Sequence, residues 1–540
     1  MAGDAAGGLP GAGAALAGFR DEIARRRTFA IISHPDAGKT TLTEKLLLYS
    51  GAVQLAGAVR ARRTQRAAVS DWMAMEQQRG ISITSTVLAF DYGGCRCNLL
   101  DTPGHADFSE DTYRTLAAAD SAVMVIDAAR GVEVQTRKLF RVCRQRGIPI
   151  LTFVNKLDRP ARPPLELLGV IEEALSIEAV PLNWPIGDGP EFQGVYDREG
   201  RRVLRYERVE HGARQAPVQV AGILDPALGR LLGEPAAARL REDVALLDGA
   251  GVDLDPARFA AGQQTPVFFG SALTNFGVEP FLDRFIELAP APAEAGGPDF
   301  AGFVFKIQSN MNPLHRDSMA FVRIGRGVFQ REAPVVHART GRRLRLGQAS
   351  TLFARERETV DVAYAGDVIG VSNPGFFAIG DALHVGAAPA PVLLPSFQPE
   401  HFAALRSGDV QRQKAFLKGL EQLEQEGAVQ ILHQPGTARR EPILAAVGRL
   451  QFEVVAFRLR AEYGVETQVE PLPYGLARWM QGDEAALAAF RPWGVLRCTD
   501  REGRPVALFS NDRELAYQAG EYPGLRFVER GEAVVPAAAG

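Results

Sequence analysis

The chain has 540 residues, more than one hydrophobic core accommodates, so three or four domains are predicted. Its 61 basic and 64 acidic residues leave a net charge of -3, which excludes an overall basic field and restricts any nucleic-acid partner to local patches. Four cysteines, at positions 95, 97, 143 and 498, do not form a metal-like set. We expect Cys95 and Cys97 to share one face of a strand as reduced thiols.

The N-terminal segment, residues 1–18, is mostly Ala and Gly, and it has no basic region ahead of an apolar run. Such a segment predicts a flexible tail and not a secretory signal. No later stretch offers about 18–20 uninterrupted apolar residues, so we expect no membrane partner. With reduced cysteines, a cytoplasmic protein is the expectation.

Residues 31–41, Ile-Ile-Ser-His-Pro-Asp-Ala-Gly-Lys-Thr-Thr, have the pattern of a strand, a loop and a helix start. They match the phosphate-loop consensus G-x-x-x-x-G-K-[ST] except at its first position, where Ser33 replaces Gly. Backbone N–H groups and the helix N-terminus of such a loop bind phosphates, while Lys39 would reach the β and γ oxygens and Thr40 a Mg²⁺ ion. An ordinary glycine turn is the alternative. The predicted phosphate-binding residues are Ser33, His34, Asp36, Ala37, Gly38, Lys39, Thr40 and Thr41.

The next segment, residues 51–78, is long, has little apolar periodicity and contains Arg60, Arg62, Arg63 and Arg66. Loops of this length are usually functional or disordered. It leads into Arg-Gly-Ile-Ser-Ile-Thr at 79–84, within a run to residue 86 where apolar and hydroxyl residues alternate as in an edge strand. The run is either a strand chosen for β propensity or a switch whose hydroxyl completes the Mg²⁺ shell, and alone it supports both.

A strand at residues 97–100 ends in Asp-Thr-Pro-Gly-His at 101–105. Asp101 is placed to hold Mg²⁺ through water, and Gly104 allows a backbone N–H to approach a γ-phosphate. His105 then lies where an attacking water would be. A single loop histidine is more often structural, but this turn and the phosphate loop both lie at the carboxyl edge of an open parallel sheet, which favours a catalytic His105.

Residues 121–127 and 148–154 are the next predicted strands, joined by a crossover helix at 131–145. The second ends in Asn155-Lys156-Leu157-Asp158. The Asp158 carboxylate can accept two hydrogen bonds from the ring N–H and exocyclic amine of guanine, which adenine does not present, and the stem of Lys156 can cover the ring. Following two phosphate elements, Asn155, Lys156 and Asp158 predict guanine specificity.

Residues 162–262 depart from a minimal α/β nucleotide domain and predict an inserted subdomain, because Pro-rich joints, Trp184-Pro185 and short strand-like pieces such as 193–196 occur there. Arg201, Arg202, Glu207 and Glu210 are expected to form its solvated face. The core sheet resumes at 266–269 and is followed by Gly-Ser-Ala-Leu, where the backbone N–H groups of Ser271 and Ala272 could reach guanine O6.

Linkers rich in Pro and Gly follow at 290–298 and 389–399. Between them, short strands predict a small β-barrel over residues 299–388, at 302–309, 318–326, 335–340, 355–360 and 367–371. Later strands at 427–432, 443–447 and 465–469, with a helix at 450–463, predict an α+β sandwich domain over 400–540 with helices on one face. The predicted fold class is therefore an α/β P-loop domain, residues 19–292, followed by the barrel and the α+β domain.

Taken in order, these segments resemble the translational GTPases of the elongation factor G type. The resemblance rests on the motifs at 33–41, 79–84, 101–105 and 155–158. Within that family, Phe-Val-Phe-Lys-Ile-Gln at 303–308 and the stretch 310–316 are similar to the bacterial peptide chain release factor 3 family. The similarity begins at about residue 19 and is weaker after about residue 493.

The resemblance implies binding of GTP or GDP with Mg²⁺ and hydrolysis of GTP to GDP and phosphate. It further implies a monomer that binds the ribosome after peptide release, helps to eject the class I release factor and hydrolyses GTP to leave. His105 would orient water when the sarcin-ricin loop of ribosomal RNA pushes it inward, so a low intrinsic rate is expected. Asp36, Lys39 and Thr40 would line the phosphates and metal, with Asp101 outside the direct Mg²⁺ ligands.

Two positions depart from the family pattern. The switch hydroxyl after Gly-Ile is generally Thr but is Ser82 here, with Thr84 two residues on; either could bind Mg²⁺, and position favours Ser82. Pro35 stands where relatives often place an aliphatic residue that screens the catalytic histidine from water. The shape of that screen is therefore left open.

The nearest alternative is an elongation factor G-like translocase or a ribosome-protection GTPase. Those chains continue for further domains, so the length of this chain favours a termination factor. An alternative of another class is a nucleotide-dependent binding module that never turns over, in which His105 is structural.

Overall fold

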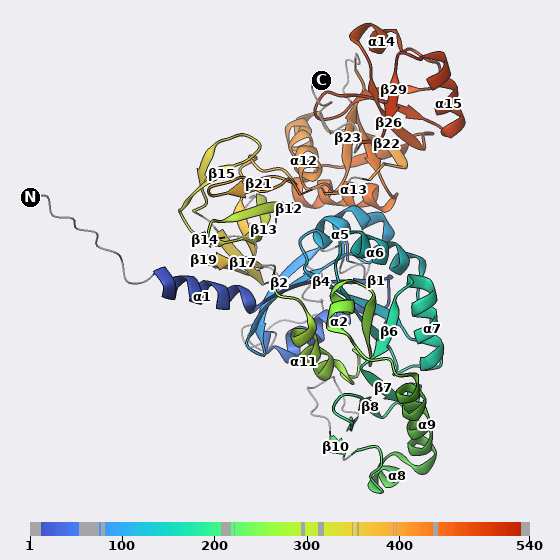
Figure 1. The fold of residues 1–540 in the computed structure, drawn as a ribbon. Coiled ribbons are helices and arrows are strands. Elements are labelled where there is room, and N and C mark those ends of the chain that lie inside the picture. Colours follow the sequence, from blue (N-terminus) through green and yellow to red (C-terminus); the bar gives the residue numbers. More distant parts are fainter. Residues whose placement is uncertain are drawn as a thin grey trace, which may run out of the picture.

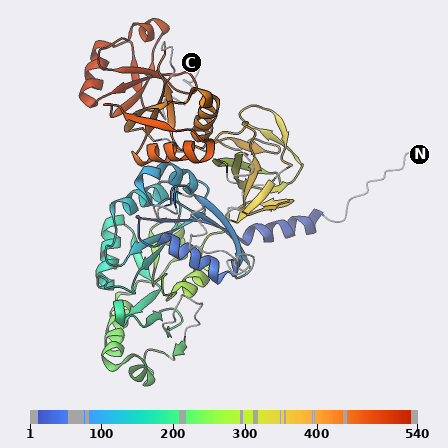
Figure 2. The same ribbon diagram turned by 180° about the vertical axis from the view of Figure 1, so that it is seen from behind.

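The computed structural model describes residues 12–52, 75–76, 82–206, 218–220, 222–292, 297–310, 318–347, 349–353, 356–392, 394–395, 397–435 and 441–530. Outside these ranges lie several residues singled out in the sequence: the arginines at 60–66, the segment 79–81, Glu207, Glu210 and residues 311–316. Figure 1 and Figure 2 show an α/β body, a barrel beside it and a C-terminal body above, which confirms the predicted fold class. The domain boundaries stay predictions.

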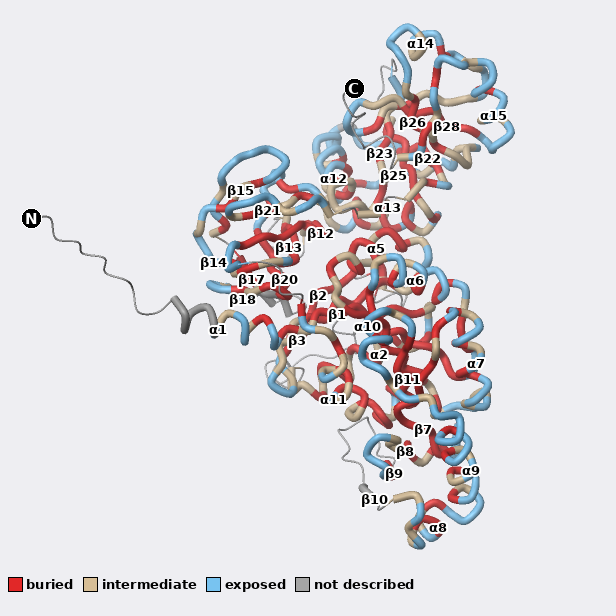
Figure 3. Tube along the Cα trace, viewed as in Figure 1, coloured by how far each residue is buried: buried red, intermediate tan, exposed pale blue. Residues whose placement is uncertain are grey.

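The α/β body is built on a sheet of order β2-β3-β1-β4-β5-β11-β6, in which only the β2–β3 pair is antiparallel. Its strands are β1 (Arg26–Ser33), β2 (Thr86–Tyr92), β3 (Cys95–Asp101), β4 (Ser121–Asp127), β5 (Ile150–Asn155), β6 (Glu178–Pro181) and β11 (Gln264–Phe269). Every residue of β4, β5 and β11 is buried, as Figure 3 shows in red. Such continuous burial is typical of a parallel sheet covered on both faces.

Helices cover the two faces of this sheet. α2 (Lys39–Tyr49) and α11 (Val278–Leu288) share one apolar cluster with the sheet. α5 (Ser109–Leu116), α6 (Val134–Gln145) and α7 (Pro164–Leu175) pack on the other face. The parallel connections place the loops after β1, β3, β4, β5 and β11 at one edge of the sheet, where ligands bind in such folds.

The range 162–262, predicted as an inserted subdomain, begins with α7 and β6 of the main sheet and then contains a four-stranded antiparallel sheet with two helices. Its strands are β7 (Asn183–Ile186), β8 (Gly194–Asp197), β9 (Arg202–Arg205) and β10 (Val218–Val220), and its helices α8 (Ala227–Leu232) and α9 (Glu234–Ala250). α10 (Pro256–Ala260) then returns the chain to β11. Buried Trp184 fastens β7 to α9, because its indole N–H donates to Asp243 at 3.0 Å.

The edge strand predicted over 79–86 is wrong in its described part, since residues 82–85 are not strand and β2 begins at Thr86. Carboxylates replace the strand ladder: Glu76 accepts the N–H groups of Ile83 and Thr84 at 2.9 and 3.1 Å. Asp111 accepts the N–H of Ser85 at 2.6 Å. Backbone donors satisfied by side chains need no neighbouring strand.

The prediction of a flexible tail over residues 1–18 is wrong from Ala12, where α1 (Ala12–Ala24) begins. Alanine is the best helix former, so an Ala-rich segment becomes helical when one face of the helix packs against another part of the protein. That surface is the barrel, because Ile23 belongs to the barrel core and Phe19 packs against it.

The barrel body consists of short antiparallel strands, as predicted. They are β12 (Ala301–Ser309), β13 (Ser318–Arg326), β14 (Val328–Gln330), β15 (Pro334–His337), β16 (Arg343–Arg345), β17 (Ala349–Phe353), β18 (Glu356–Thr359), β19 (Val362–Tyr364), β20 (Val368–Ser372) and β21 (Ala382–His384). One residue pair, Phe353 with Leu88, joins β17 to β2 of the α/β body.

The C-terminal body is one sheet of order β25-β22-β24-β23-β27-β28-β26-β29. Its strands are β22 (His401–Ser407), β23 (Gln430–His433), β24 (Pro442–Ala446), β25 (Thr467–Pro471), β26 (Leu476–Gln481), β27 (Leu496–Thr499), β28 (Pro505–Phe509) and β29 (Arg526–Val528). Its two halves share an apolar cluster that includes Phe402 and Trp479. α12 (Gln413–Gln425) and α13 (Leu450–Tyr463) cover the first half, so Phe452, Val455 and Leu459 are core as expected. α14 (Glu484–Ala489) and α15 (Asp512–Glu521) pack on the second half.

Buried charges join the three bodies. Lys306 of the barrel is buried and donates to the carbonyl of Ser85, with Asp111 at 3.9 Å. Burial lowers the pKa of Lys306, although Asp111 opposes this shift. In the C-terminal body, buried Arg458 pairs with Glu426 and with Glu462. Glu426 also accepts the backbone N–H of Ser309 from the barrel at 2.7 Å.

Among the described helices, none is both long and apolar enough to cross a bilayer.

Replacing Arg458 by methionine is expected to lower the free energy of unfolding by about 3–5 kcal/mol, because Glu426 and Glu462 lose their buried counter-charge. The shift of the urea midpoint measures this change. The control is Arg406→Met, whose ion pairs with Glu441 and Glu470 are exposed, and it should leave the midpoint almost unchanged. An Arg458 variant as stable as the control would contradict the structural role of the pair.

Candidate nucleotide site

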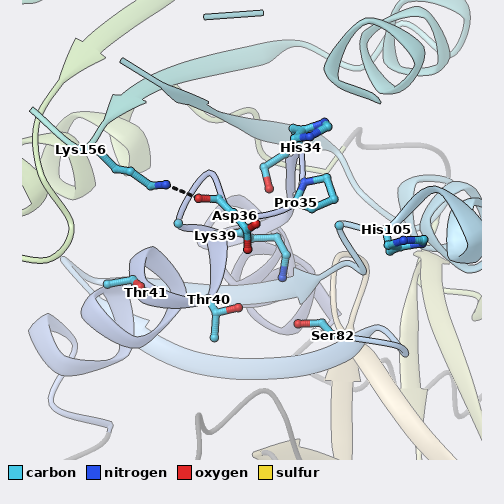
Figure 4. A pocket seen from close by; sticks show the side chains of 12 residues that line it. His34, Pro35, Asp36, Lys39, Thr40, Thr41, Ser82, His105 and Lys156 are labelled. Carbon is cyan, nitrogen blue, oxygen red and sulfur yellow. Dashed lines mark hydrogen bonds between the residues drawn. The ribbon is translucent and has the colours of Figure 1, made fainter. Parts of the chain in front are cut away.

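A cavity of about 280 Å³ lies at the carboxyl edge of the parallel sheet. It is lined by Ser33, His34, Pro35, Asp36, Gly38, Lys39, Thr40, Thr41, Ser82, Gly104, His105 and Lys156, and Figure 4 shows their arrangement. The cavity therefore brings together the phosphate loop, the switch segment at Ser82, the turn after β3 and the loop after β5. Ala37 does not line it: this residue is buried, and its carbonyl faces Asn155.

The phosphate loop presents backbone donors. Asp36 and Gly38 have φ of +66° and +96°, a left-handed conformation that turns the chain sharply into α2. Gly38 is the N-cap of α2, and no side chain caps this helix end. The first-turn N–H groups and the helix dipole are therefore available to an anion, as in phosphate sites.

The ammonium of Lys39 is buried and donates to one carboxylate oxygen of Asp101. The second oxygen of Asp101 is buried without a hydrogen-bond partner. The cavity is lined by the hydroxyl residues Thr40 and Ser82 and by Lys39, which contacts Asp101. These residues, with the unpartnered carboxylate oxygen, fit a Mg²⁺ ion bound by hydroxyls, water and phosphate oxygens. Among the described residues, no three His, Cys, Asp or Glu side chains are grouped so that they could hold a metal ion.

Ser82 lines the cavity, whereas Thr84 lies elsewhere, with its N–H on Glu76. The two hydroxyl residues therefore do not share a strand face, and Ser82 is the one that faces the phosphate loop. Pro35 lines the same cavity, and a Cβ added at Gly104 would be in ordinary contact with the Pro35 Cα at 3.5 Å.

The loop after β5 is tied to the phosphate loop. Asn155 donates to the carbonyl of Ala37 at 2.9 Å, and its oxygen accepts the N–H of Ala272 at 2.9 Å. Ser271 donates its hydroxyl to Asp158 at 2.6 Å. The structure thus gathers the predicted guanine-binding residues next to the phosphate loop.

The N–H groups of Ser271 and Ala272 are donated within the protein, to the carbonyl of Phe276 and to Asn155, both at 2.9 Å. The predicted contact with guanine O6 therefore requires one of these bonds to be exchanged. In this structure the two residues instead hold Asn155 and Asp158 in place.

Two acidic residues of the site were missed. Asp127, at the carboxyl end of β4, accepts the Lys156 ammonium at 2.9 Å. Burial raises the pKa of Asp127, but Lys156 and the N–H groups of Ala129 and Arg130 outweigh burial and hold it below its ordinary value. Asp127 ends a buried apolar strand, which is the same sequence signal that singled out Asp101. Glu133 lies 3.0 Å from Nε2 of His34, whereas Nδ1 of the same ring is buried without a hydrogen-bond partner. No sequence signal marks Glu133.

Replacing Gly38 by alanine is expected to weaken nucleotide binding about 10- to 100-fold, since it adds about 1–2 kcal/mol of left-handed strain and breaks the Asn155 bond. A Cβ at Gly38 would overlap the Asn155 amide. The control is Gly51→Ala, which has φ of +77° but nothing within 4 Å. Titration with a fluorescent GDP analogue measures both; equal losses would show that strain alone matters.

Comparisons with known proteins agree with this geometry. Residues 24–291 match the family described as "Elongation factor Tu GTP binding domain", and residues 299–386 match "Elongation factor G domain 2". Residues 392–519 match "Class II release factor RF3, C-terminal domain". A crystal structure of ttk003000868 from Thermus thermophilus shares the fold, with a TM-score of 0.68 and 23% identity over 88% of this chain and 72% of that one.

Fold and site together define a translation-factor GTPase with a guanine-nucleotide domain, a barrel and an α+β domain. Peptide chain release factor 3 of Gloeobacter violaceus is 56% identical over 519 residues, 94% of this chain and 98% of that protein. The same factor of Symbiobacterium thermophilum is 55% identical, with the same coverage. The chain belongs to the peptide chain release factor 3 family.

Proposed function

We propose that this protein is a ribosome-stimulated GTPase of translation termination that promotes the departure of class I release factors after peptide release. Its partners are then the ribosome, including the sarcin-ricin loop of its RNA, and a class I release factor. The protein acts as a cytoplasmic monomer between ribosomes. The supporting observation is one cavity in which Lys39, Ser82 and His105 meet, in a chain whose C-terminal body matches release factor 3.

Each residue of the site has a distinct role in the proposed reaction. The loop N–H groups and Lys39 hold the β- and γ-phosphates, and Asp158 accepts the two guanine donors. Thr40 and Ser82 would bind Mg²⁺, with Asp101 holding it through water. The metal would supply positive charge that offsets the negative charge of the phosphates.

His105 orients a water molecule whose oxygen attacks the γ-phosphorus as the bond to the bridging oxygen breaks, giving GDP and phosphate. In Figure 4 its ring is directed away from Lys39 and Thr40, toward the helical turn that follows. The side chain is 37% exposed. With the ring in this orientation, we expect slow hydrolysis until the ribosome turns the imidazole toward the attacking water.

The test measures GTP hydrolysis with and without ribosomes. We expect slow turnover alone and strong stimulation by ribosomes. No turnover in either case would favour the non-catalytic binding module, and equal measurable rates would contradict stimulation by the ribosome. Translocation assayed on elongating ribosomes separates the alternative of an elongation factor G-like or ribosome-protection GTPase, and the proposed function predicts none.

A further inference from the structure

The carboxylate of Asp107 lies between the catalytic turn and the C-terminal body. Asp107 belongs to the short helical turn η1 (Ala106–Phe108), directly after His105. Its Oδ1 is 3.3 Å from His105 Nδ1, and its backbone N–H donates to the same nitrogen at 3.2 Å. The backbone N–H and the carboxylate of Asp107 thus both lie next to Nδ1 of the imidazole.

The other oxygen of Asp107 reaches the C-terminal body. Oδ2 accepts the N–H of Leu450, the first residue of α13, at 2.9 Å. A carboxylate at this end of a helix is favoured by unpaired N–H groups and by the helix dipole. Gly448 packs so closely against the carboxylate that a Cβ there would overlap it.

Apolar contacts support the same junction. Phe108 shares a buried cluster with Val454 of α13, and the His105 ring lies 6.1 Å from the Phe108 ring. In Figure 1 and Figure 2, α13 lies against the α/β body close to α5. A shift of α13 therefore moves the residues that hold the histidine.

We infer that Asp107 is a positioning residue that links the turn carrying His105 to α13 and holds the imidazole in its observed orientation, at the edge of the nucleotide cavity and not turned toward the phosphates, until the C-terminal body shifts. This inference rests on the proposed function, because it concerns the timing of the same hydrolysis. Through Asp107, the C-terminal body thus restrains the catalytic side chain.

The test measures ribosome-free GTP hydrolysis of the full-length protein at saturating GTP. Asp107→Ala should raise this rate about three- to tenfold, as expected for the loss of one partly exposed charged hydrogen bond. Gly448→Ala should do the same from the C-terminal side by displacing the carboxylate. The double variant should show no further rise, because both changes break one contact.

Two further variants exclude a general loosening of the protein. Asp483 caps α14 through the N–H of Ala486 at 2.6 Å, so Asp483→Ala removes the same kind of bond far from the site and should keep the parental rate. Adding His105→Ala to Asp107→Ala should abolish the gain. A parental rate in both Asp107→Ala and Gly448→Ala, or a gain that persists without His105, would overturn the inference. Stimulation of the parent by ribosomes in the same assay tests the proposed function separately.

Discussion

Replacing His105 by alanine is expected to lower ribosome-stimulated GTP hydrolysis by about 10²–10⁴-fold, the usual contribution of a positioned side chain that activates a reacting group. Nucleotide affinity should not change, because the proposed phosphate and base contacts come from the loops after β1 and β5 and not from the imidazole. Single-turnover hydrolysis on ribosomes, with GTP affinity measured in parallel, separates the two effects.

His34→Ala is the matched control for His105. Both are loop histidines that line the same cavity, but the His34 ring pairs with Glu133. Removing that ring should leave most of the stimulated rate. Weaker binding with normal turnover in the His105 variant would refute the role given to His105.

Replacing Asp158 by asparagine is expected to weaken GTP binding by about 10²–10⁴-fold and to shift preference toward xanthosine triphosphate. Each charged hydrogen bond to the guanine donors contributes about 1.5–3 kcal/mol, and asparagine cannot accept both. Its amide can instead donate to the carbonyl that xanthine carries in place of the amine. Competition between the two triphosphates measures the shift.

Ser271→Ala serves as the control for this variant. This change removes the hydroxyl that donates a hydrogen bond to Asp158 but leaves the Asp158 carboxylate in place. Its GTP affinity should fall much less, and its base preference should remain guanine. Unchanged GTP affinity in Asp158→Asn would contradict the assignment of the base site.

The elements that position the site were predictable because their signals are local. Strands β4 and β5 are mainly apolar runs that end in a polar residue, and helix α13 was predicted with its observed bounds. Parallel pairing then places the ends of such strands together, so Lys39 and Asp101 could be expected to meet.

What could not be predicted depends on contacts distant in sequence. Ser82 and Thr84 were placed on one strand face, but Glu76 and Asp111 hold this segment out of the sheet. No sequence pattern marks Asp107, because its partner Leu450 lies far along the chain. Side-chain acceptors of this kind leave no periodic pattern.

The most direct test of the proposed function uses post-termination ribosomes that hold a fluorescently labelled class I release factor. Adding this protein with GTP should accelerate departure of the label, and His105→Ala should bind without completing its own cycle. The same protein should not promote translocation on elongating ribosomes. Departure of the label at the unassisted rate, with wild-type protein and GTP present, would contradict the proposal that this protein promotes departure of class I release factors.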